Sequence, residues 1–373
     1  MPESLRQGCP LELPLAALTR HVSILGATGS GKSTTATVIA RGLASRGVST
    51  VILDRTGEYA TSLKGIENVA VFEPGTNLVM ALFQFDKNAS VSSQLEAWIG
   101  LLDHYLAVTY DSRISPLQSR VLREVIGQYY RGTQETLTIS KLIEKLRAYE
   151  DRVRRVSGWE ESIEAIISRL VPLTVDFVGK TFNQPFSTLD LASLFRGTVS
   201  IFDMSAITED GGKNLLSQLV FKQLYQWMKA KDMTDAVSLV LILDEAQHLA
   251  PSRDYLSIPE RCAIELRKYG FSLIAIATRP ALVSSNILSN SGTVVSHLLV
   301  NERDIDVVSG FLLGGSDELV ARRWLRTLST GSAVVQQNFP VPKRPVVCAI
   351  GASEEFSRGR TQVGDGLGVR GPS

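Results

Sequence analysis

Short apolar runs alternate with stretches of helical spacing along most of the chain. The expected helices of this part lie at 34–43 and 214–231, and the expected strands lie at 21–25, 49–54, 69–72, 197–203, 239–243, 273–277, 293–300, 331–336 and 346–350. Strand, loop and helix in repeated succession are typical of a mostly parallel sheet covered by helices. The pattern therefore predicts the α/β fold class.

The middle of the chain has a different pattern. Apolar residues recur at helical spacing in four segments, 95–106, 117–130, 139–149 and 162–170. We therefore expect a helical insertion at 90–195, within a core formed by 21–89 and 196–350. Residues 1–20 are expected to form an N-terminal arm. Residues 351–373, rich in glycine, serine and charge, are expected to form a flexible tail.

The composition of the chain excludes a globally basic nucleic-acid-binding protein and a protein with an apolar membrane span. The 373 residues are 44% hydrophobic and carry a net charge of +1, so a large core can form and any nucleic-acid surface must be local. Cys9, Cys262 and Cys348 lack pairing or metal spacing, which predicts reduced thiols in the cytoplasm. No apolar run is long enough to cross a bilayer, so direct membrane insertion is not expected.

A phosphate-binding loop is the clearest chemical signal. Residues 26–33 read GATGSGKS, the G-x-x-x-x-G-K-S pattern, between a strand-like run and a helical stretch. Backbone N–H groups of such a loop face phosphate oxygens, Lys32 reaches the β- and γ-phosphates, and the Ser33 hydroxyl contacts Mg²⁺. The pattern predicts ATP and Mg²⁺ as ligands, bound by Gly26, Ala27, Thr28, Gly29, Ser30, Gly31, Lys32, Ser33 and Thr34.

A second acidic motif supports the same chemistry. The buried-strand run at 239–243 ends in Asp244 and Glu245. Asp244 is expected to hold Mg²⁺, and Glu245 is expected to act as the general base on the attacking water. The D-x-x-G sequence of Asp54 to Gly57 matches GTPase switch regions, but no N-K-x-D guanine-reading motif follows it. The later acidic pair therefore favours an ATPase.

Four ordered motifs together resemble a known superfamily. RHVSILGATGSGKS, VILDRTGEY, LVLILDEAQHLAP and ELRKYGFSLIAIATRP are similar to the HerA/FtsK superfamily of DNA translocases, and most similar to its HerA branch, over roughly residues 14–350. The resemblance implies a RecA-like P-loop core, a homohexamer and ATP-driven movement of duplex DNA. A nuclease or another effector protein is a further expected partner.

The chain departs from this family in three places. About twenty residues precede the first strand, so we expect the family's N-terminal β-barrel to be lacking. Thr278 stands where the family usually has Gln before the Arg-Pro pair, and Leu266 stands where Gly commonly precedes Arg-Lys.

The resemblance suggests further roles. Arg267, in the R-K-Y-G element, is expected to supply the trans-acting positive charge of a ring ATPase, with Arg279 as second candidate. Thr278 is expected to sense the γ-phosphate, because its strand should lie beside that of Asp244. An ordinary surface arginine and an ordinary strand-end hydroxyl remain the alternatives.

Three further segments have open interpretations. Glu58 is either a link from the site to DNA or a solvated turn residue. The basic residues Arg147 and 152–155 suit a solvated helix face better than DNA contact, because acidic residues interleave. Loop 208–214 is either a pore loop or a mobile turn.

The chemistry supports two functions of different kinds. The first is a motor that couples ATP hydrolysis to movement along duplex DNA. The second is an ATP-gated ring that recruits or regulates an effector with little translocation. The general base favours catalysis, and the near-neutral charge weakens the case for DNA work by this chain alone.

Overall fold

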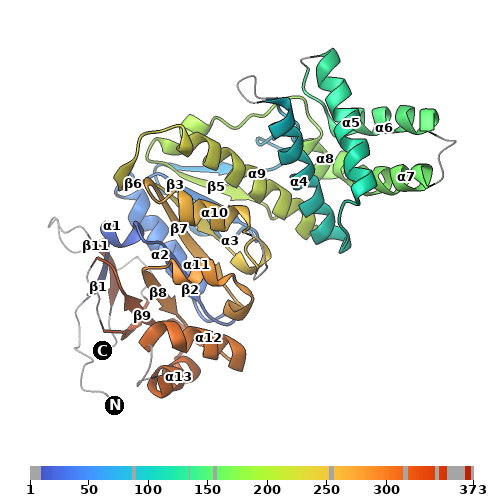
Figure 1. Ribbon diagram of the computed structural model, residues 1–373. Helices are drawn as coiled ribbons and strands as arrows, with labels where there is room; N and C mark the ends of the chain where they lie inside the picture. Colours follow the sequence, from blue (N-terminus) through green and yellow to red (C-terminus); the bar gives the residue numbers. More distant parts are fainter. Residues whose placement is uncertain are drawn as a thin grey trace. The chain divides into compact units, whose positions relative to one another are not determined.

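The computed structural model describes residues 10–85, 90–133, 135–153, 158–251, 256–313, 318–340, 344–350 and 366–370. Its contacts divide the chain into two compact units. The first unit comprises Met1–Val71, Leu191–Phe202 and Phe221–Ser373, and the second comprises Phe72–Asp190 and Asp203–Val220 (Figure 1). These bounds differ from the expected domain limits, because residues 72–89 and 203–220 belong to the second unit and residues 191–195 belong to the first.

A mixed sheet forms the first unit. Its described strands are β1 Pro10–Pro14, β2 Val22–Leu25, β3 Thr50–Asp54, β4 Val69–Phe72, β5 Val199–Asp203, β6 Thr234–Leu243, β7 Tyr269–Ala277, β8 Thr293–Ser296, β9 Ser332–Gln337, β10 Val346–Ala349 and β11 Gly366–Arg370. They lie in the order β1-β11-β10-β9-β8-β2-β7-β6-β3-β5-β4. Strands β8, β2, β7, β6 and β3 are parallel neighbours. This arrangement confirms the expected α/β fold class and brings five carboxyl strand ends to one edge.

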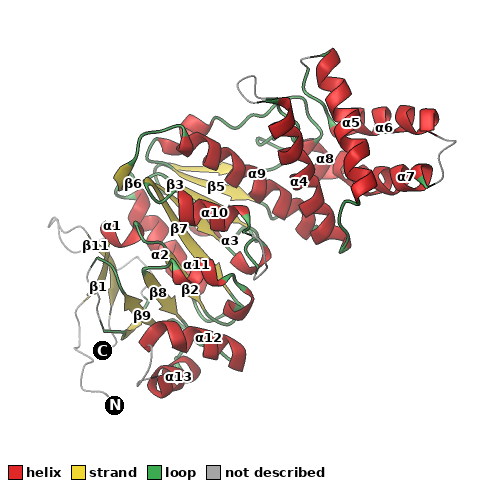
Figure 2. Cartoon of the chain, viewed as in Figure 1, coloured by secondary structure: helices red, strands yellow, loops and turns green. Residues whose placement is uncertain are grey.

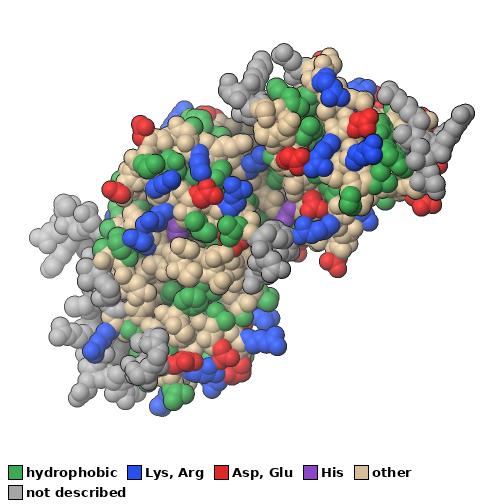
Figure 3. Space-filling model, in the orientation of Figure 1, with side chains coloured by type: hydrophobic (Ala, Val, Ile, Leu, Met, Phe, Trp, Pro, Cys, Tyr) green, Lys and Arg blue, Asp and Glu red, His purple; other side chains and the backbone are tan. Residues whose placement is uncertain are grey.

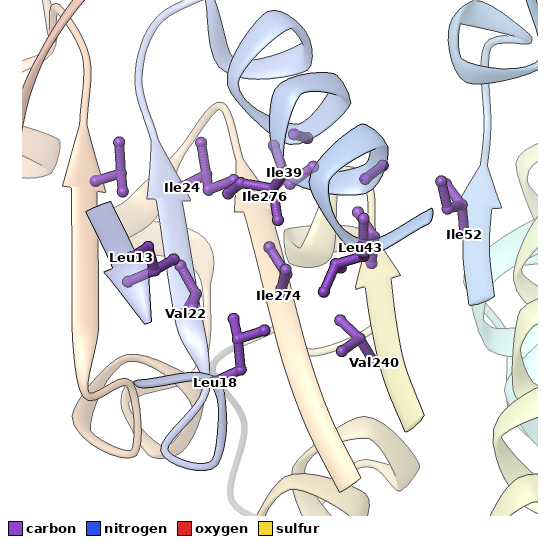
Figure 4. Packing of buried hydrophobic residues seen from close by; sticks show 14 of the residues in the cluster. Leu13, Leu18, Val22, Ile24, Ile39, Leu43, Ile52, Val240, Ile274 and Ile276 are labelled. Carbon is purple, nitrogen blue, oxygen red and sulfur yellow. The ribbon is translucent and has the colours of Figure 1, made fainter. Parts of the chain in front are cut away.

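Helices cover the sheet of the first unit. The described ones are α1 Leu15–Leu18, α2 Lys32–Ala44, α3 Glu58–Ser62, η2 Leu191–Phe195, η3 Ala246–His248, α10 Ile258–Glu265, η4 Pro280–Leu282, α11 Ser285–Ser289, α12 Glu302–Leu313 and α13 Glu318–Thr327. Ile39 and Leu43 of α2 point at Ile24, Ile274 and Ile276 of the sheet (Figure 4). Burying such side chains contributes about 1.5–3 kcal/mol each, and it fixes α2 over the parallel strands.

The amino-terminal segment pairs with the other end of the chain. Within the expected arm, β1 forms an antiparallel ladder with β11, from Pro10 opposite Arg370 to Pro14 opposite Gly366. The expected flexible tail lies mostly outside the described residues, and its 366–370 segment forms β11. These residues therefore add edge strands to the sheet.

The second unit is mostly helical (Figure 2). Its described helices are α4 Val91–Tyr110, α5 Pro116–Gly132, α6 Ile139–Val153, α7 Trp159–Leu170, η1 Val171–Thr174 and α8 Asp176–Phe182. Ser115 caps α5 in a reciprocal capping box with Gln118, and Pro116 occupies the first turn. Each of the four segments with helical spacing is thus a helix. Within the described residues, no helix combines the length and apolarity needed to cross a membrane.

The expected loop at 208–214 is wrong from Asp210 onward, because α9 Asp210–Lys229 begins there. A β-carbon at Gly211 would lie 1.8 Å from the Thr109 hydroxyl oxygen, and one at Gly212 would lie 2.8 Å from Ile207. The two glycines therefore permit close packing within the second unit. In the sequence alone they had indicated a turn. Of the expected basic run, Arg154 and Arg155 lie outside the described residues.

Candidate nucleotide site

The loop between β2 and α2 has its conformation fixed by close contacts. The Gly26 N–H donates to the Ala277 carbonyl at 3.2 Å, and the Ala27 N–H donates to the Leu298 carbonyl at 2.7 Å. A β-carbon at Gly26 would lie 2.6 Å from the Ser30 hydroxyl oxygen, so only glycine fits. The ends of β7 and β8 therefore hold the loop from both sides.

The same loop leaves hydrogen-bond donors open. Gly31 adopts a left-handed conformation with φ 113°, and α2 starts after it with no side-chain cap and no acidic residue in its first turn. In the described part of the chain, the N–H groups of Gly29 and Gly31 have no acceptor. Helix N-termini carry partial positive charge and unsatisfied N–H groups. The loop is therefore built to receive an anion such as a phosphate.

Lys32 places a cation at this loop. Its ammonium donates to the Ala27 carbonyl at 3.0 Å. Burial lowers the pKa of Lys32, while the charges of Glu245 and Asp244 oppose that shift. A buried ammonium that is short of anionic partners gains free energy when phosphate oxygens approach.

A buried histidine that sequence reasoning missed supports the loop from beneath. The His297 Nδ1 donates to the Ser332 carbonyl at 2.9 Å, so its Nε2 accepts from the Thr35 hydroxyl at 2.9 Å. Burial lowers the pKa of His297 to about 4, which keeps the ring neutral near pH 7. The one available signal was a histidine inside the apolar run at 293–300. Its ring ties the first turns of α2 to β9.

The two acidic residues after β6 face the loop. Leu53 of β3 pairs with Leu243 of β6, so Asp54 and Asp244 occupy the next adjacent positions. Burial, followed by the charges of Glu245 and Asp54, raises the pKa of Asp244 to about 7. A divalent cation would favour its charged form and relieve this cost. A carboxylate and a hydroxyl suit Mg²⁺, so Asp244 with Ser33 fits the expected metal.

Glu245 is bonded on both carboxylate oxygens. The Thr278 hydroxyl donates to Oε1 at 2.9 Å, and the Gln247 side-chain amide donates to Oε2. Thr278 directly follows β7, which is the parallel neighbour of β6. The structure thus brings Thr278 to the site as expected from strand adjacency, but its hydroxyl donates its hydrogen bond to Glu245. Gln247 was not anticipated as part of the site.

The backbone N–H groups of the D-x-x-G segment and the helix after it donate to the carboxylate of Asp54, the first residue of the motif. Asp54 accepts from the N–H groups of Gly57 at 2.8 Å and Tyr59 at 2.9 Å, and also from those of Thr56 and Ala60. Four bonds to backbone donors make Asp54 the structural cap of α3. Glu58, whose interpretation was open, lies exposed on the first turn of this helix.

A pocket of about 260 Å³ lies beside the phosphate loop. Its walls come from one face of α2 and from α3, and the Arg41 guanidinium ties the two helices together through a 2.7 Å bond to the Ser62 carbonyl. The lining residues are Ser33, Thr34, Thr37, Val38, Arg41, Glu58 and Ser62. The pocket thus continues from Ser33 and Thr34 at the loop.

The two candidate arginines lie at opposite ends of β7. Arg267 is exposed and precedes Tyr269, the first residue of the strand. The nine residues of β7 span about 30 Å, so Arg267 does not reach Glu245 of its own chain. Arg279 follows Thr278 at the other end, where it pairs with the buried Asp304 at 2.9 Å. The site therefore assembles Lys32, Ser33, Asp244, Glu245 and Thr278 without Arg267.

Comparison with known sequences gives one family. A family model described as the central domain of helicase HerA matches residues 5–224. The DNA double-strand break repair helicase HerA of Sulfolobus acidocaldarius is 25% identical over 355 residues, which are 91% of this chain and 66% of that protein. The corresponding protein of Sulfurisphaera tokodaii is 26% identical, over 90% of this chain and 65% of its own length. The chain thus spans just under two-thirds of these relatives.

Solved structures share the fold. VirB4 of Thermoanaerobacter pseudethanolicus superposes with a TM-score of 0.66 at 15% identity, covering 95% of this chain and 99% of that one. The plasmid coupling protein TrwB in complex with ADP and Mg²⁺ gives a TM-score of 0.60 at 17% identity, covering 88% and 85%. Both likenesses support the RecA-like P-loop fold expected from the sequence.

Proposed function

Because the chain belongs to the family of the HerA helicase central domain, we propose that it is an ATPase that moves duplex DNA as a homohexameric ring. The observation that carries the proposal is the meeting of an open phosphate loop, a buried lysine and two carboxylates at one edge of the sheet. Each group suits one part of a phosphoryl-transfer site.

The loop and its neighbours would bind the nucleotide. The open N–H groups and Lys32 would contact the β- and γ-phosphates, and Ser33 with Asp244 would hold Mg²⁺, which neutralises phosphate charge when bound. Residues 26–34 form this cradle. The pocket between α2 and α3 would receive the nucleoside, because it begins at Ser33 and Thr34. TrwB has been solved with both ATP and GTP analogues.

Hydrolysis would use Glu245 as the base. Its carboxylate takes a proton from water as the water oxygen bonds to the γ-phosphorus and the bond to the β-phosphate oxygen breaks. ADP and inorganic phosphate leave. Asp244, adjacent on the same turn, keeps the base next to the metal-binding position.

DNA as the substrate is inferred from the names of the relatives, and ring formation is inferred from the family resemblance. The curated ones are named DNA double-strand break repair helicases. On the face shown in Figure 3, blue basic and red acidic side chains are interspersed, in agreement with the net charge of +1. Phosphate contacts would therefore come from a local surface. A nuclease or other effector remains a proposed partner, and the cytoplasm remains the proposed compartment.

Turnover with and without duplex DNA tests the proposal. We expect the intact chain to hydrolyse MgATP several-fold faster with duplex DNA at low salt. Glu245→Gln should bind ATP normally and hydrolyse it at least about 100-fold more slowly, the usual contribution of a general base. An ATPase rate that does not change when duplex DNA is added would favour an ATP-gated scaffold. A near-normal rate for Glu245→Gln would mean that another residue is the base, and Glu58 would be tested next.

Mixed rings test the role of Arg267. Since Arg267 lies about 30 Å from its own Glu245, it can serve only a neighbour's site. Arg267→Ala and Glu245→Gln should each be nearly inactive, and mixing them should restore part of the activity through interfaces that join two intact residues. If verified mixed rings show only the sum of the two variants, the trans role fails and Arg279 becomes the candidate.

A further inference from the structure

Glu245 is fixed at both its backbone and its side chain. Its φ of 50° lies in the left-handed region, which is uncommon for a residue other than glycine. Its N–H donates to Asp244 Oδ1 at 3.0 Å, and its carbonyl accepts from the His248 N–H at 3.0 Å. A residue held this firmly has little freedom except at its three side-chain torsions.

Two donors remove that remaining freedom. Thr278 approaches Oε1 from the end of β7, and Gln247 approaches Oε2 from η3, the turn that follows β6. The Gln247 amide must present its nitrogen to the carboxylate, because its oxygen would be repelled. Its own Oε1 is then buried and has no partner among the described residues. An amide whose oxygen is kept buried without a partner indicates that the bond to Glu245 matters.

The Thr278 hydroxyl has one proton, and it donates a hydrogen bond through that proton to Glu245. In this arrangement the Thr278 side chain has no donor left for a γ-phosphate oxygen. If Thr278 senses the γ-phosphate, removing its hydroxyl should weaken ATP binding. If the hydroxyl instead holds Glu245, its removal should lower turnover and leave binding unchanged.

We propose that Gln247 and Thr278 are positioning residues that clamp the Glu245 carboxylate for water activation, an inference that rests on the proposed role of Glu245 as general base. A carboxylate offers about four lone-pair sites. The two donors fill one on each oxygen and leave the others facing a fixed direction. A reacting group misplaced by about 1 Å can lose about 10²-fold in rate, so the clamp acts on turnover rather than on binding.

Four single variants separate positioning from general damage. Gln247→Leu and Thr278→Val remove one donor each with little change in size, and we expect each to lower kcat at least about tenfold. Thr278→Ser keeps the hydroxyl and should stay within about twofold of the parent chain. His248→Ala is the matched control, since His248 is exposed on the same η3 turn, and it should behave like the parent.

Nucleotide affinity decides between a clamp and a phosphate sensor. Clamp variants should bind a non-hydrolysable ATP analogue and ADP as the parent does, measured by calorimetry with Mg²⁺. If Thr278→Val binds the ATP analogue at least about tenfold more weakly while ADP binding is unchanged, the hydroxyl senses the γ-phosphate and the clamp is wrong for Thr278. Unfolding midpoints within a few degrees of the parent exclude misfolding.

A second background isolates the route of action. In Glu245→Ala there is no carboxylate to hold, so adding Gln247→Leu or Thr278→Val should not lower the residual single-turnover rate further. Equal fold losses in both backgrounds would overturn the clamp. If Glu245→Ala itself retains normal turnover, the proposed base has failed instead. If Glu245→Ala is inactive and both clamp variants turn over normally, only this inference fails.

Discussion

Two successive strand–loop–helix segments of the first unit have similar backbones but differ in whether the loop contains its own anion. After β2 and after β3, the chain makes a tight loop, passes through a left-handed glycine and starts a helix without a side-chain cap from the preceding residue. Gly31 has φ 113° and Gly57 has φ 82°. The β3 loop contains Asp54, which fills four backbone donors, whereas the β2 loop contains no acidic residue.

The difference shows what makes a loop bind phosphate. A helix N-terminus attracts anions wherever it occurs. In the β3 loop the chain provides the anion itself, so the donors are satisfied in the folded protein. In the β2 loop the donors stay open and Lys32 adds a cation. The absence of an internal carboxylate is as important to the site as the glycines.

The largest expected effect comes from removing the internal anion. Asp54→Ala should lower the free energy of unfolding by about 3 kcal/mol, because hydrogen bonds to a charged group contribute about 1.5–3 kcal/mol and several are lost together. Urea unfolding of the nucleotide-free chain measures this effect.

The same variant gives a direct test of the comparison. Formate can enter the space left by the Asp54 carboxylate, so about 0.1 M formate should raise the unfolding midpoint of Asp54→Ala more than that of the parent chain. Chloride at equal ionic strength is the control. An equal response of both proteins would show that the β3 loop is not a closed anion site.

Lys32→Ala should affect binding rather than folding. Removing one member of a buried charge pair costs about 2 kcal/mol or more, so MgATP should bind at least about 30-fold more weakly. The nucleotide-free chain should unfold at the same urea concentration as the parent, because burial already disfavours this ammonium. ATP affinity within about twofold of the parent would contradict the loop's role.

The smallest effects compare two glycines. Gly29 has φ 74° and Gly57 has φ 82°, so alanine at either position should cost about 1 kcal/mol of unfolding free energy. A β-carbon at Gly29 meets no described atom within 4 Å, and it would occupy the open side where phosphate approaches. Only Gly29→Ala should weaken ATP binding, by about tenfold. Equal loss of affinity in both variants would remove the distinction between the loops.

Local patterns predicted the parts of the site that are adjacent in sequence. The spacing of Gly26, Gly31 and Lys32 specifies the phosphate loop, and strand adjacency placed Thr278 beside Glu245. The support of the loop by His297 was not predictable, because its partner Thr35 is 262 positions away. Gln247 is only two residues from Glu245, but its role depends on the left-handed backbone of Glu245, which a glutamate in the sequence does not indicate.

Other misses have the same physical origin. The two glycines at the start of α9 read as a turn because their need for close packing depends on Thr109 and Ile207, which the local sequence does not show. The pairing of β1 with β11 joins opposite ends of the chain, and neither strand has a periodic pattern that identifies its partner. Sequence reasoning therefore succeeded where a few neighbouring residues decide the structure.

The separation of Arg267 from Glu245 along β7 also constrains symmetry. If Glu245 is the base, each chain carries it at one edge of the sheet and the exposed Arg267 about 30 Å away at the other edge, so a ring would join two unlike surfaces. If each cation completes the next subunit's site, the subunits join head to tail, and every copy repeats the same rotation. Such contacts end only when the rotation closes a cycle, and otherwise they continue into a helical filament.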